Sequence, residues 1–345
     1  MNEPSSTSAS PFDFPEGHEP RRGRLLTSGI VLGLIGCLLG FLSALYLFIM
    51  PTILGGTSAM AVPETEGMGD YLKSSMLLAG LFIGIAAAAF LITGAGGIFL
   101  KRWSRPFAFF LSGTWLYLGL FYLVYMLAFA GQIKVEMQNQ MNEAVAAAPG
   151  GAAAAPPAVG ADSFFGIFIV FTVTLIFIFG LALPAFILWL NWHRDVRVTL
   201  EFCDTKERWT DRCPIPVLNL VLGAIFCALS LLPAIVQAIF PFFGQFVLGP
   251  PAQIAYLAVA VVLCAIAFGL YHRKFWAWLA LVLLFAVGAV SGIMTSFQAD
   301  YRQIYENMGM PEEMIDQSIR SVEIMWKTPQ AIVISALFAL PVIGY

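Results

Sequence analysis

Long apolar segments alternate with short polar ones along almost the whole chain. Each apolar segment is close to the roughly 20 residues that an α-helix needs to cross the hydrocarbon core of a bilayer. The pattern therefore predicts an all-α, polytopic integral membrane protein with eight transmembrane helices. The predicted spans are residues 25–50, 74–100, 107–130, 164–190, 217–240, 254–270, 276–297 and 329–345.

The segment before the first span, residues 1–20, is rich in Ser, Pro and acidic side chains. Such a composition offers little apolar surface to bury, so we predict a disordered tail. A cleaved secretory signal is the competing interpretation, because Ala59-Met60-Ala61 resembles a cleavage site. The first apolar segment is about twice as long as a usual signal core, which favours a retained transmembrane helix.

The composition agrees with a membrane protein and argues against other classes. Hydrophobic residues make up 59% of the 345 residues and charged residues 11%, whereas soluble domains average about 45–50% apolar and 25% charged residues. The net charge of −3 gives no basic surface for nucleic acid. The five Cys residues form no close pairs along the sequence, so no disulfide framework is predicted. The lipid bilayer is the first predicted partner.

Basic residues gather in alternate loops. Most of the 18 Lys and Arg residues lie before the first predicted span, after the second, in residues 191–216 and after the sixth. The positive-inside rule places these loops in the cytoplasm, and with them both termini. We therefore predict a multi-pass protein of the cell membrane, specifically of a bacterial inner membrane.

The two halves of the chain resemble each other. Residues 31–51 align without gaps to residues 221–241, and weaker matches follow in the same order. These later matches pair Arg105 with Lys274 and Pro184 with Pro341. An even number of spans in each copy gives both copies the same orientation. The prediction is two parallel four-helix repeats, residues 21–190 and 217–345, joined by a cytoplasmic connector, residues 191–216.

Glycine stripes in the first two predicted spans indicate close helix packing, since small residues let helix backbones approach each other in lipid. The stripes consist of Gly29, Gly33, Gly36 and Gly40 in the first span and Gly80 and Gly84 in the second. The second half has Phe226 where the first has Gly36, so the halves are expected to pack differently. Residues 94–97, Gly-Ala-Gly-Gly, predict a kink or thinning of the second helix, where a transported solute would bind.

The connector carries ten charged residues between almost unbroken apolar sequences. Four apolar residues in it, Val196, Val198, Leu200 and Phe202, alternate with polar ones. This period of two predicts a short strand. We predict that the connector is a contact surface for a partner, formed by Arg197, Arg208, Trp209 and Arg212.

An amphipathic helix is predicted on the opposite side of the membrane, in residues 311–327. Its apolar residues recur at helical spacing, and charged residues occupy the other face. The apolar residues are Ile315, Ile319, Val322 and Trp326. They form a second candidate surface for a partner, although packing on the protein's own bundle is the simpler interpretation.

Signals of catalysis and metal binding are weak. All Asp, Glu, Lys and Arg residues fall in the tail, the loops or the span ends, whereas proton relays and pathways for charged substrates use ionisable residues inside the membrane. His193, Cys203 and Cys213 are the one conceivable metal set, and their spacing is not that of a zinc site. No cofactor is predicted.

We therefore expect a non-catalytic membrane protein, namely an accessory, scaffold or assembly subunit of a larger complex with other membrane-protein subunits as partners. The alternative is a transporter or channel for a neutral or lipid-like solute, because such a pathway needs no charged residue in the membrane. A membrane enzyme is the third interpretation, and its catalytic groups would have to come from the loops.

Overall fold

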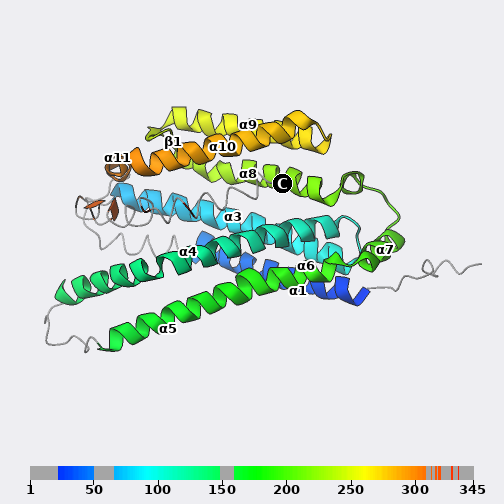
Figure 1. Cartoon of the computed structure of the whole chain (residues 1–345), viewed down its shortest axis with the longest axis horizontal. Coiled ribbons are helices and arrows are strands. Elements are labelled where there is room, and N and C mark those ends of the chain that lie inside the picture. Colours follow the sequence, from blue (N-terminus) through cyan, green and yellow to red (C-terminus); the bar gives the residue numbers. More distant parts are fainter. Residues whose placement is uncertain are drawn as a thin grey trace, which may run out of the picture.

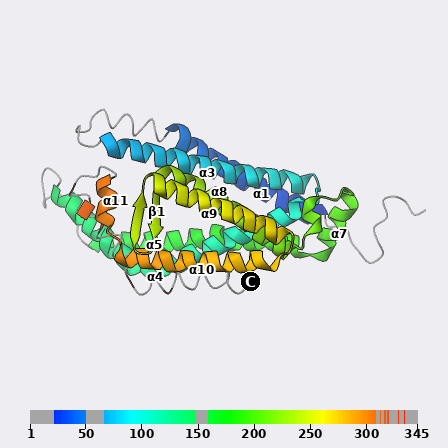
Figure 2. The same ribbon diagram turned by 90° about the horizontal axis from the view of Figure 1, so that it is seen from above.

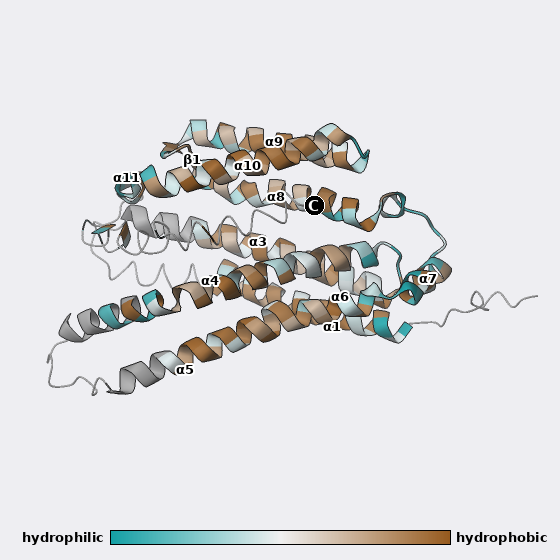
Figure 3. Ribbon diagram, in the orientation of Figure 1, coloured by the Kyte–Doolittle hydropathy of each residue, from teal (hydrophilic) through white to brown (hydrophobic). Residues whose placement is uncertain are grey.

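The computed structural model describes residues 22–49, 66–147 and 159–307, together with a few single positions between 312 and 333. Figure 1 shows an elongated bundle of long, roughly parallel helices. Hydrophobic residues fill the middle of the bundle, and hydrophilic residues gather toward its two ends (Figure 3). Helix α7 (Arg194–Cys203) lies at one end, which we call the connector end. The opposite end, called the hairpin end, carries strand β1 (Ile239–Phe242) and helix α11 (Tyr301–Asn307) (Figure 2).

The first half of the chain forms long helical rods. Helix α1 (Arg22–Ala44) continues into a π-helical turn, η1 (Leu45–Ile49). Helices α3 (Glu66–Ile98) and α4 (Ser104–Ala147) follow. The last rod is built from α5 (Val159–Leu175), the π-helix η4 (Ile176–Ala182) and α6 (Leu183–Trp192).

The second half begins after the connector, which contains α7 and a 3-10 turn, η5 (Trp209–Arg212). Helix α8 (Ile215–Gln237) leads into β1 and β2 (Gln245–Leu248). Helices α9 (Pro250–Tyr271) and α10 (Phe275–Gln298) then run along the bundle.

Seven helices in the described part of the chain are long and apolar enough to cross a membrane. The protein is therefore a helical, multi-pass membrane protein. The seven spans are Arg22–Ile49, Ser75–Ile98, Ser104–Val135, Gly166–Trp192, Ile215–Gln237, Pro250–Tyr271 and Phe275–Gln298. The eighth predicted span, residues 329–345, lies outside the described residues apart from Val333.

Helices α1 and α3 pack backbone to backbone through glycine. A Cβ atom on Gly29 would lie 2.7 Å from the carbonyl oxygen of Gly94, and one on Gly36 would lie 2.8 Å from the backbone nitrogen of Leu91. Backbone atoms cannot move aside as a flexible side chain can. Both positions therefore require glycine for this close approach.

The other predicted packing glycines divide into two groups. Cβ atoms on Gly80 and Gly84 would lie 2.9 Å and 2.8 Å from the nearest side-chain atoms, so these two positions also pack tightly. A Cβ atom on Gly33 would meet nothing within 4 Å, and one on Gly40 would be 3.9 Å from its nearest neighbour. Four of the six predicted glycines are thus at tight contacts.

Helix α3 continues through residues 94–97 and ends at Ile98, so the glycines there do not interrupt it. Its glycines serve packing instead. Gly94 and Gly97 face the backbone of α1, and Gly96 lies under the ring of Trp103. The site for a transported solute that was predicted from this run therefore has no unwound backbone to form it.

Helix α8 packs on both halves of the bundle. Its residues share an apolar core with α9 and α10, formed by Val221, Ala224, Ala228, Leu263, Ile266, Ala267, Leu270, Ala277 and Leu281. On another side of α8, the ring of Phe226 lies 5.7 Å from that of Phe82 on α3 and 6.3 Å from that of Phe110 on α4. Gly36, which aligns with Phe226 in sequence, packs within the first half. The two positions that align in sequence therefore make different contacts.

A β-hairpin follows α8 where the sequence predicted the end of a span and a loop. Strands β1 and β2 are antiparallel, with Ile239 opposite Leu248. Phe243 and Gly244 between them have φ of 41° and 93°, as in the type I′ turns that suit two-residue hairpin loops. The Phe243 N–H donates to the Ser291 hydroxyl, and the Gly244 N–H donates to the Thr295 hydroxyl. The hairpin tip is thus fixed to α10.

Candidate contact surface at the connector end

The connector contains a helix, α7, where the alternating pattern predicted a strand, so the strand prediction is wrong. Val196 and Leu200 are four residues apart, and this spacing fits one face of a helix as well as one face of a strand. Arg197 and Glu201 have the same spacing and form an ion pair of 2.7 Å. Such a pair supports a helix and has no counterpart within one strand.

Helix α7 lies at the connector end of the bundle (Figure 1). Val196 and Leu200 are buried against Leu25 of α1 and Leu100 of the α3–α4 turn. The side chain of Arg197, by contrast, is 66% exposed. The helix is therefore amphipathic, with one face on the protein and one free.

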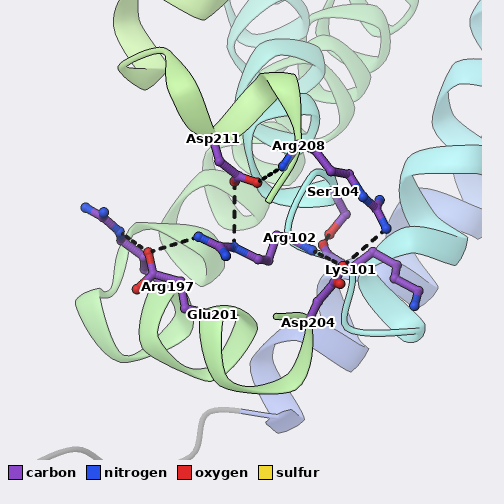
Figure 4. A network of polar contacts seen from close by, with 8 residues as sticks. All are labelled: Lys101, Arg102, Ser104, Arg197, Glu201, Asp204, Arg208 and Asp211. Atoms are coloured by element: carbon purple, nitrogen blue, oxygen red, sulfur yellow. Dashed lines mark hydrogen bonds and ion pairs between the residues drawn. The ribbon is translucent and has the colours of Figure 1, made fainter. Parts of the chain in front are cut away.

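Asp204 ties the connector to the α3–α4 turn (Figure 4). Its buried carboxylate accepts a hydrogen bond of 3.2 Å from the backbone N–H of Arg102. The same carboxylate oxygen forms an ion pair of 3.4 Å with Arg208. Charge-assisted hydrogen bonds of this kind are stronger than neutral ones. Asp204 therefore fixes the segment between α7 and η5 on the first half.

The side chain of Arg102 links two further parts of the connector (Figure 4). It lies 3.9 Å from the carboxylate of Glu201 on α7 and 3.7 Å from that of Asp211 in η5. Asp211 also accepts a hydrogen bond of 2.9 Å from the backbone N–H of Arg208. One arginine thus holds α7 and η5 in a common network.

The connector also contacts the second half. The Tyr271 hydroxyl donates to the carbonyl of Trp209, and the guanidinium of Arg273 donates to the carbonyl of Arg212. The ring of Trp209 lies 6.3 Å from that of Phe107 on α4 and 6.2 Å from that of Tyr271 on α9. The connector is therefore a cap that is fixed to both halves.

The α3–α4 and α9–α10 turns have the same geometry. In each, a residue other than glycine closes the helix with φ of 54°, as in a Schellman motif. The following lysine donates its N–H to a glycine carbonyl, at 2.8 Å and 2.9 Å, and a tryptophan ring covers that glycine. The equivalent residues are Gly96 and Gly269, Leu100 and Arg273, Lys101 and Lys274, and Trp103 and Trp276. Lys101, rather than Arg105, is therefore the structural counterpart of Lys274.

The predicted contact residues of the connector lie in this cap. Arg197, Trp209 and Arg212 are exposed. Arg208 is half-buried, since it pairs with Asp204. The first three are thus available to a partner, whereas Arg208 serves the cap's own structure.

The second predicted surface is described in part. Ile315 is buried and Ile319 is half-buried, whereas Asp316 is exposed and pairs with Arg302 of α11. These positions follow the amphipathic pattern, with the apolar side on the protein. Val322 and Trp326 lie outside the described residues.

His193, Cys203 and Cys213 do not form a metal site, and no group of three or more His, Cys, Asp or Glu among the described residues could hold a metal ion. His193 and Cys203 are exposed, whereas Cys213 is buried. Burial raises the pKa of the Cys213 thiol, and the neighbouring Arg273 opposes this rise. A raised pKa keeps a thiol protonated and weakly nucleophilic.

An apolar groove of about 360 Å³ lies on the side of the bundle, between α4 and the π-helix η4. Its lining includes Leu118, Tyr122 and Phe179. At its base the backbone of Gly119 contacts that of Gly180, and no Cβ atom fits between them. Because π-helical segments often occur at functional sites, the groove is a second candidate site.

Sequence reasoning missed the residues that fix the cap. No sequence pattern singles out Arg102 or Asp204 among the charged residues of the loops. Asn191 is buried and donates a hydrogen bond of 2.8 Å to the Ser28 hydroxyl of α1, and its carbonyl accepts one from Arg105. The concentration of charge in alternate loops was the one sequence signal that pointed to polar contacts at this end of the bundle.

No protein-family model, curated protein or solved structure matches this chain. The functional interpretation therefore rests on the geometry of the connector end.

Proposed function

We propose that this chain is a non-catalytic membrane subunit that holds other membrane proteins together through its connector end. One observation carries the proposal: the cap is fixed to both halves of the bundle, while Arg197 and Trp209 stay exposed on it. A surface that is ordered before binding loses little conformational entropy on association. Trp and Arg are also enriched among the residues that dominate binding at interfaces.

The proposal includes an eight-span architecture of two parallel repeats, with the connector in the cytoplasm of a bacterial cell. The shared geometry of the α3–α4 and α9–α10 turns supports the repeat. The basic residues of both turns and of the connector gather at one end, which supports a cytoplasmic position for that end. The cap would then present its exposed arginines to partners at the inner membrane face.

Native mass spectrometry tests the proposed assembly role. The protein purified in a mild detergent from its own membrane is expected to carry a second polypeptide in a fixed ratio. Arg197→Glu should release that polypeptide, because it reverses the charge on the exposed face of α7. Arg194→Glu is the matched control, since Arg194 is exposed on the same helix and forms no ion pair within the described residues. A wild-type protein that is monomeric and carries no second polypeptide contradicts the proposal.

Transport of a lipid-like solute is the second candidate function. The apolar groove between α4 and η4 favours it, because the groove is open on the side of the bundle and has a lining of apolar and aromatic residues. A solute with an acyl chain would fit such a lining.

A further inference from the structure

Three loops line a cavity of about 380 Å³ at the connector end. Its walls come from the α3–α4 turn with the start of α4, from the connector, and from the α9–α10 turn. The lining includes five arginines and two carboxylates: Arg102, Arg105, Arg197, Arg212, Arg273, Glu201 and Asp211. We call it the basic cavity. Both halves of the bundle contribute to it.

Two of the five arginines are neutralised inside the basic cavity. Arg102 lies within 4 Å of both carboxylates, and Arg197 pairs with Glu201. The remaining three, Arg105, Arg212 and Arg273, form no ion pair with any described residue. The cavity therefore keeps positive charge that the protein itself does not compensate.

The hydrogen bonds of these three arginines leave donors available. Arg105 donates through Nε to the carbonyl of Asn191 at 3.2 Å, and Arg273 donates through one Nη to the carbonyl of Arg212 at 3.0 Å. A guanidinium carries five N–H donors. Arg273 also contacts the thiol of Cys213 through a side-chain hydrogen bond. Arg105 and Arg273 are thus held in place while further N–H donors of both remain for a ligand, and the exposed guanidinium of Arg212 adds its own donors.

Thr210 supplies a second and independent observation. Its side chain lines the basic cavity and is 4% exposed, and its hydroxyl oxygen is buried without a hydrogen-bond partner. A buried polar group without a partner is unfavourable. A ligand oxygen in the cavity would satisfy the hydroxyl.

Exposed tryptophans place the cavity near the membrane surface. Trp189 and Trp192 at the end of α6 and Trp276 at the start of α10 are all exposed at the connector end. Such rings favour the level of the lipid headgroups. The basic cavity therefore lies at a depth that a headgroup can reach.

We infer that the basic cavity binds a phosphate group, carried by an anionic phospholipid headgroup or by a soluble phosphate compound. The planar guanidinium fork matches phosphate oxygens with two parallel hydrogen bonds, and basic pockets between transmembrane helices bind anionic headgroups. A bound phosphate would also bridge the two halves through Arg105 and Arg273. The inference does not depend on a partner polypeptide, so either proposal can fail alone.

The test uses the full chain in detergent with two probes, phosphatidylglycerol followed by native mass spectrometry and inorganic pyrophosphate followed by calorimetry. Phosphatidylcholine serves as the neutral lipid. The double variant Arg212→Gln with Arg273→Gln should weaken binding of either probe about 30-fold, because each lost charge contributes about fivefold. Arg194→Gln with Lys274→Gln removes the same charge outside the cavity, from exposed positions, and should leave affinity within about twofold.

Thr210→Val is the second variant, because it keeps the side-chain shape and removes the unpaired hydroxyl. This variant should fold at least as stably as the wild type. It should bind the phosphate probe about fivefold more weakly, because one hydrogen bond to the ligand is lost. Saturable binding of phosphatidylglycerol identifies a headgroup as the source, and binding of pyrophosphate alone identifies a soluble phosphate. Absence of saturable binding to either probe overturns the inference. The inference is also overturned if the wild type, the double arginine variant and Thr210→Val bind the probe with equal affinity.

Discussion

Gly29→Ala and Gly36→Ala are each expected to lower the free energy of unfolding by about 1–3 kcal/mol, the usual range for overpacking a tight interface. A Cβ atom on Gly29 would press on the carbonyl oxygen of Gly94, and one on Gly36 on the backbone of Leu91. Helices α1 and α3 would have to separate along their length to relieve either contact. Unfolding of the purified protein in mixed micelles measures the loss.

Gly33→Ala is the control for both variants. Gly33 lies in the same stripe, but its Cβ atom would meet nothing within 4 Å. Because alanine favours a helix over glycine by up to about 1 kcal/mol, this variant should be as stable as the wild type or more stable. Equal stability of all three variants would show that α1 and α3 do not pack through these faces.

Asp204→Ala is expected to destabilise the cap by about 1.5–3 kcal/mol, as for the loss of hydrogen bonds to a charged group. The variant leaves the backbone N–H of Arg102 and the guanidinium of Arg208 without their shared acceptor. The connector should then separate from the α3–α4 turn. Limited proteolysis with trypsin measures this, because cleavage at Lys206 and Arg208 should become faster.

Glu207→Ala is the control for the connector. It removes the same charge from an exposed position that forms no ion pair within the described residues. Cleavage should stay at the wild-type rate. If both variants are cleaved equally fast, Asp204 does not fix the connector to the bundle.

The sequence predicted the seven spans that the structure describes, because the length of an apolar segment is a local property. No knowledge of the neighbours was needed to place α3 or α8. The same reasoning gave the wrong structure for α7, since Val196 and Leu200 fit a helix and a strand equally. The spacing of four between Arg197 and Glu201, which form an ion pair in the structure, would have favoured the helix over the strand.

The packing glycines show where sequence periodicity stops being informative. Gly29, Gly33 and Gly36 belong to one stripe, yet Gly33 has open space where its Cβ would be. The backbone of Gly33 does lie against α3, because a Cβ atom on Gly94 would be 2.7 Å from the nitrogen of Gly33. The stripe does not reveal which of its members would direct a Cβ atom of its own at the neighbouring helix. That choice depends on where α3 crosses α1.

The cap could not be predicted for a related reason. Arg102 and Asp204 are 102 residues apart in the chain, and only the fold brings them together. The unpaired hydroxyl of Thr210 likewise has no sequence signal. The sequence did predict that the charged loops lie on the same side of the membrane, and therefore at one end of the bundle.

The sidedness of Cys203 tests the central claim, that the connector end is a cytoplasmic cap. Cys203 is exposed at the end of α7, and the other four cysteines can be replaced by alanine. A membrane-impermeant maleimide should label Cys203 only after the cells are permeabilised. In a cysteine-free background, Gln245→Cys at the exposed hairpin end should be labelled in intact cells. Labelling of Cys203 in intact cells, at the rate of the hairpin cysteine, would contradict the account.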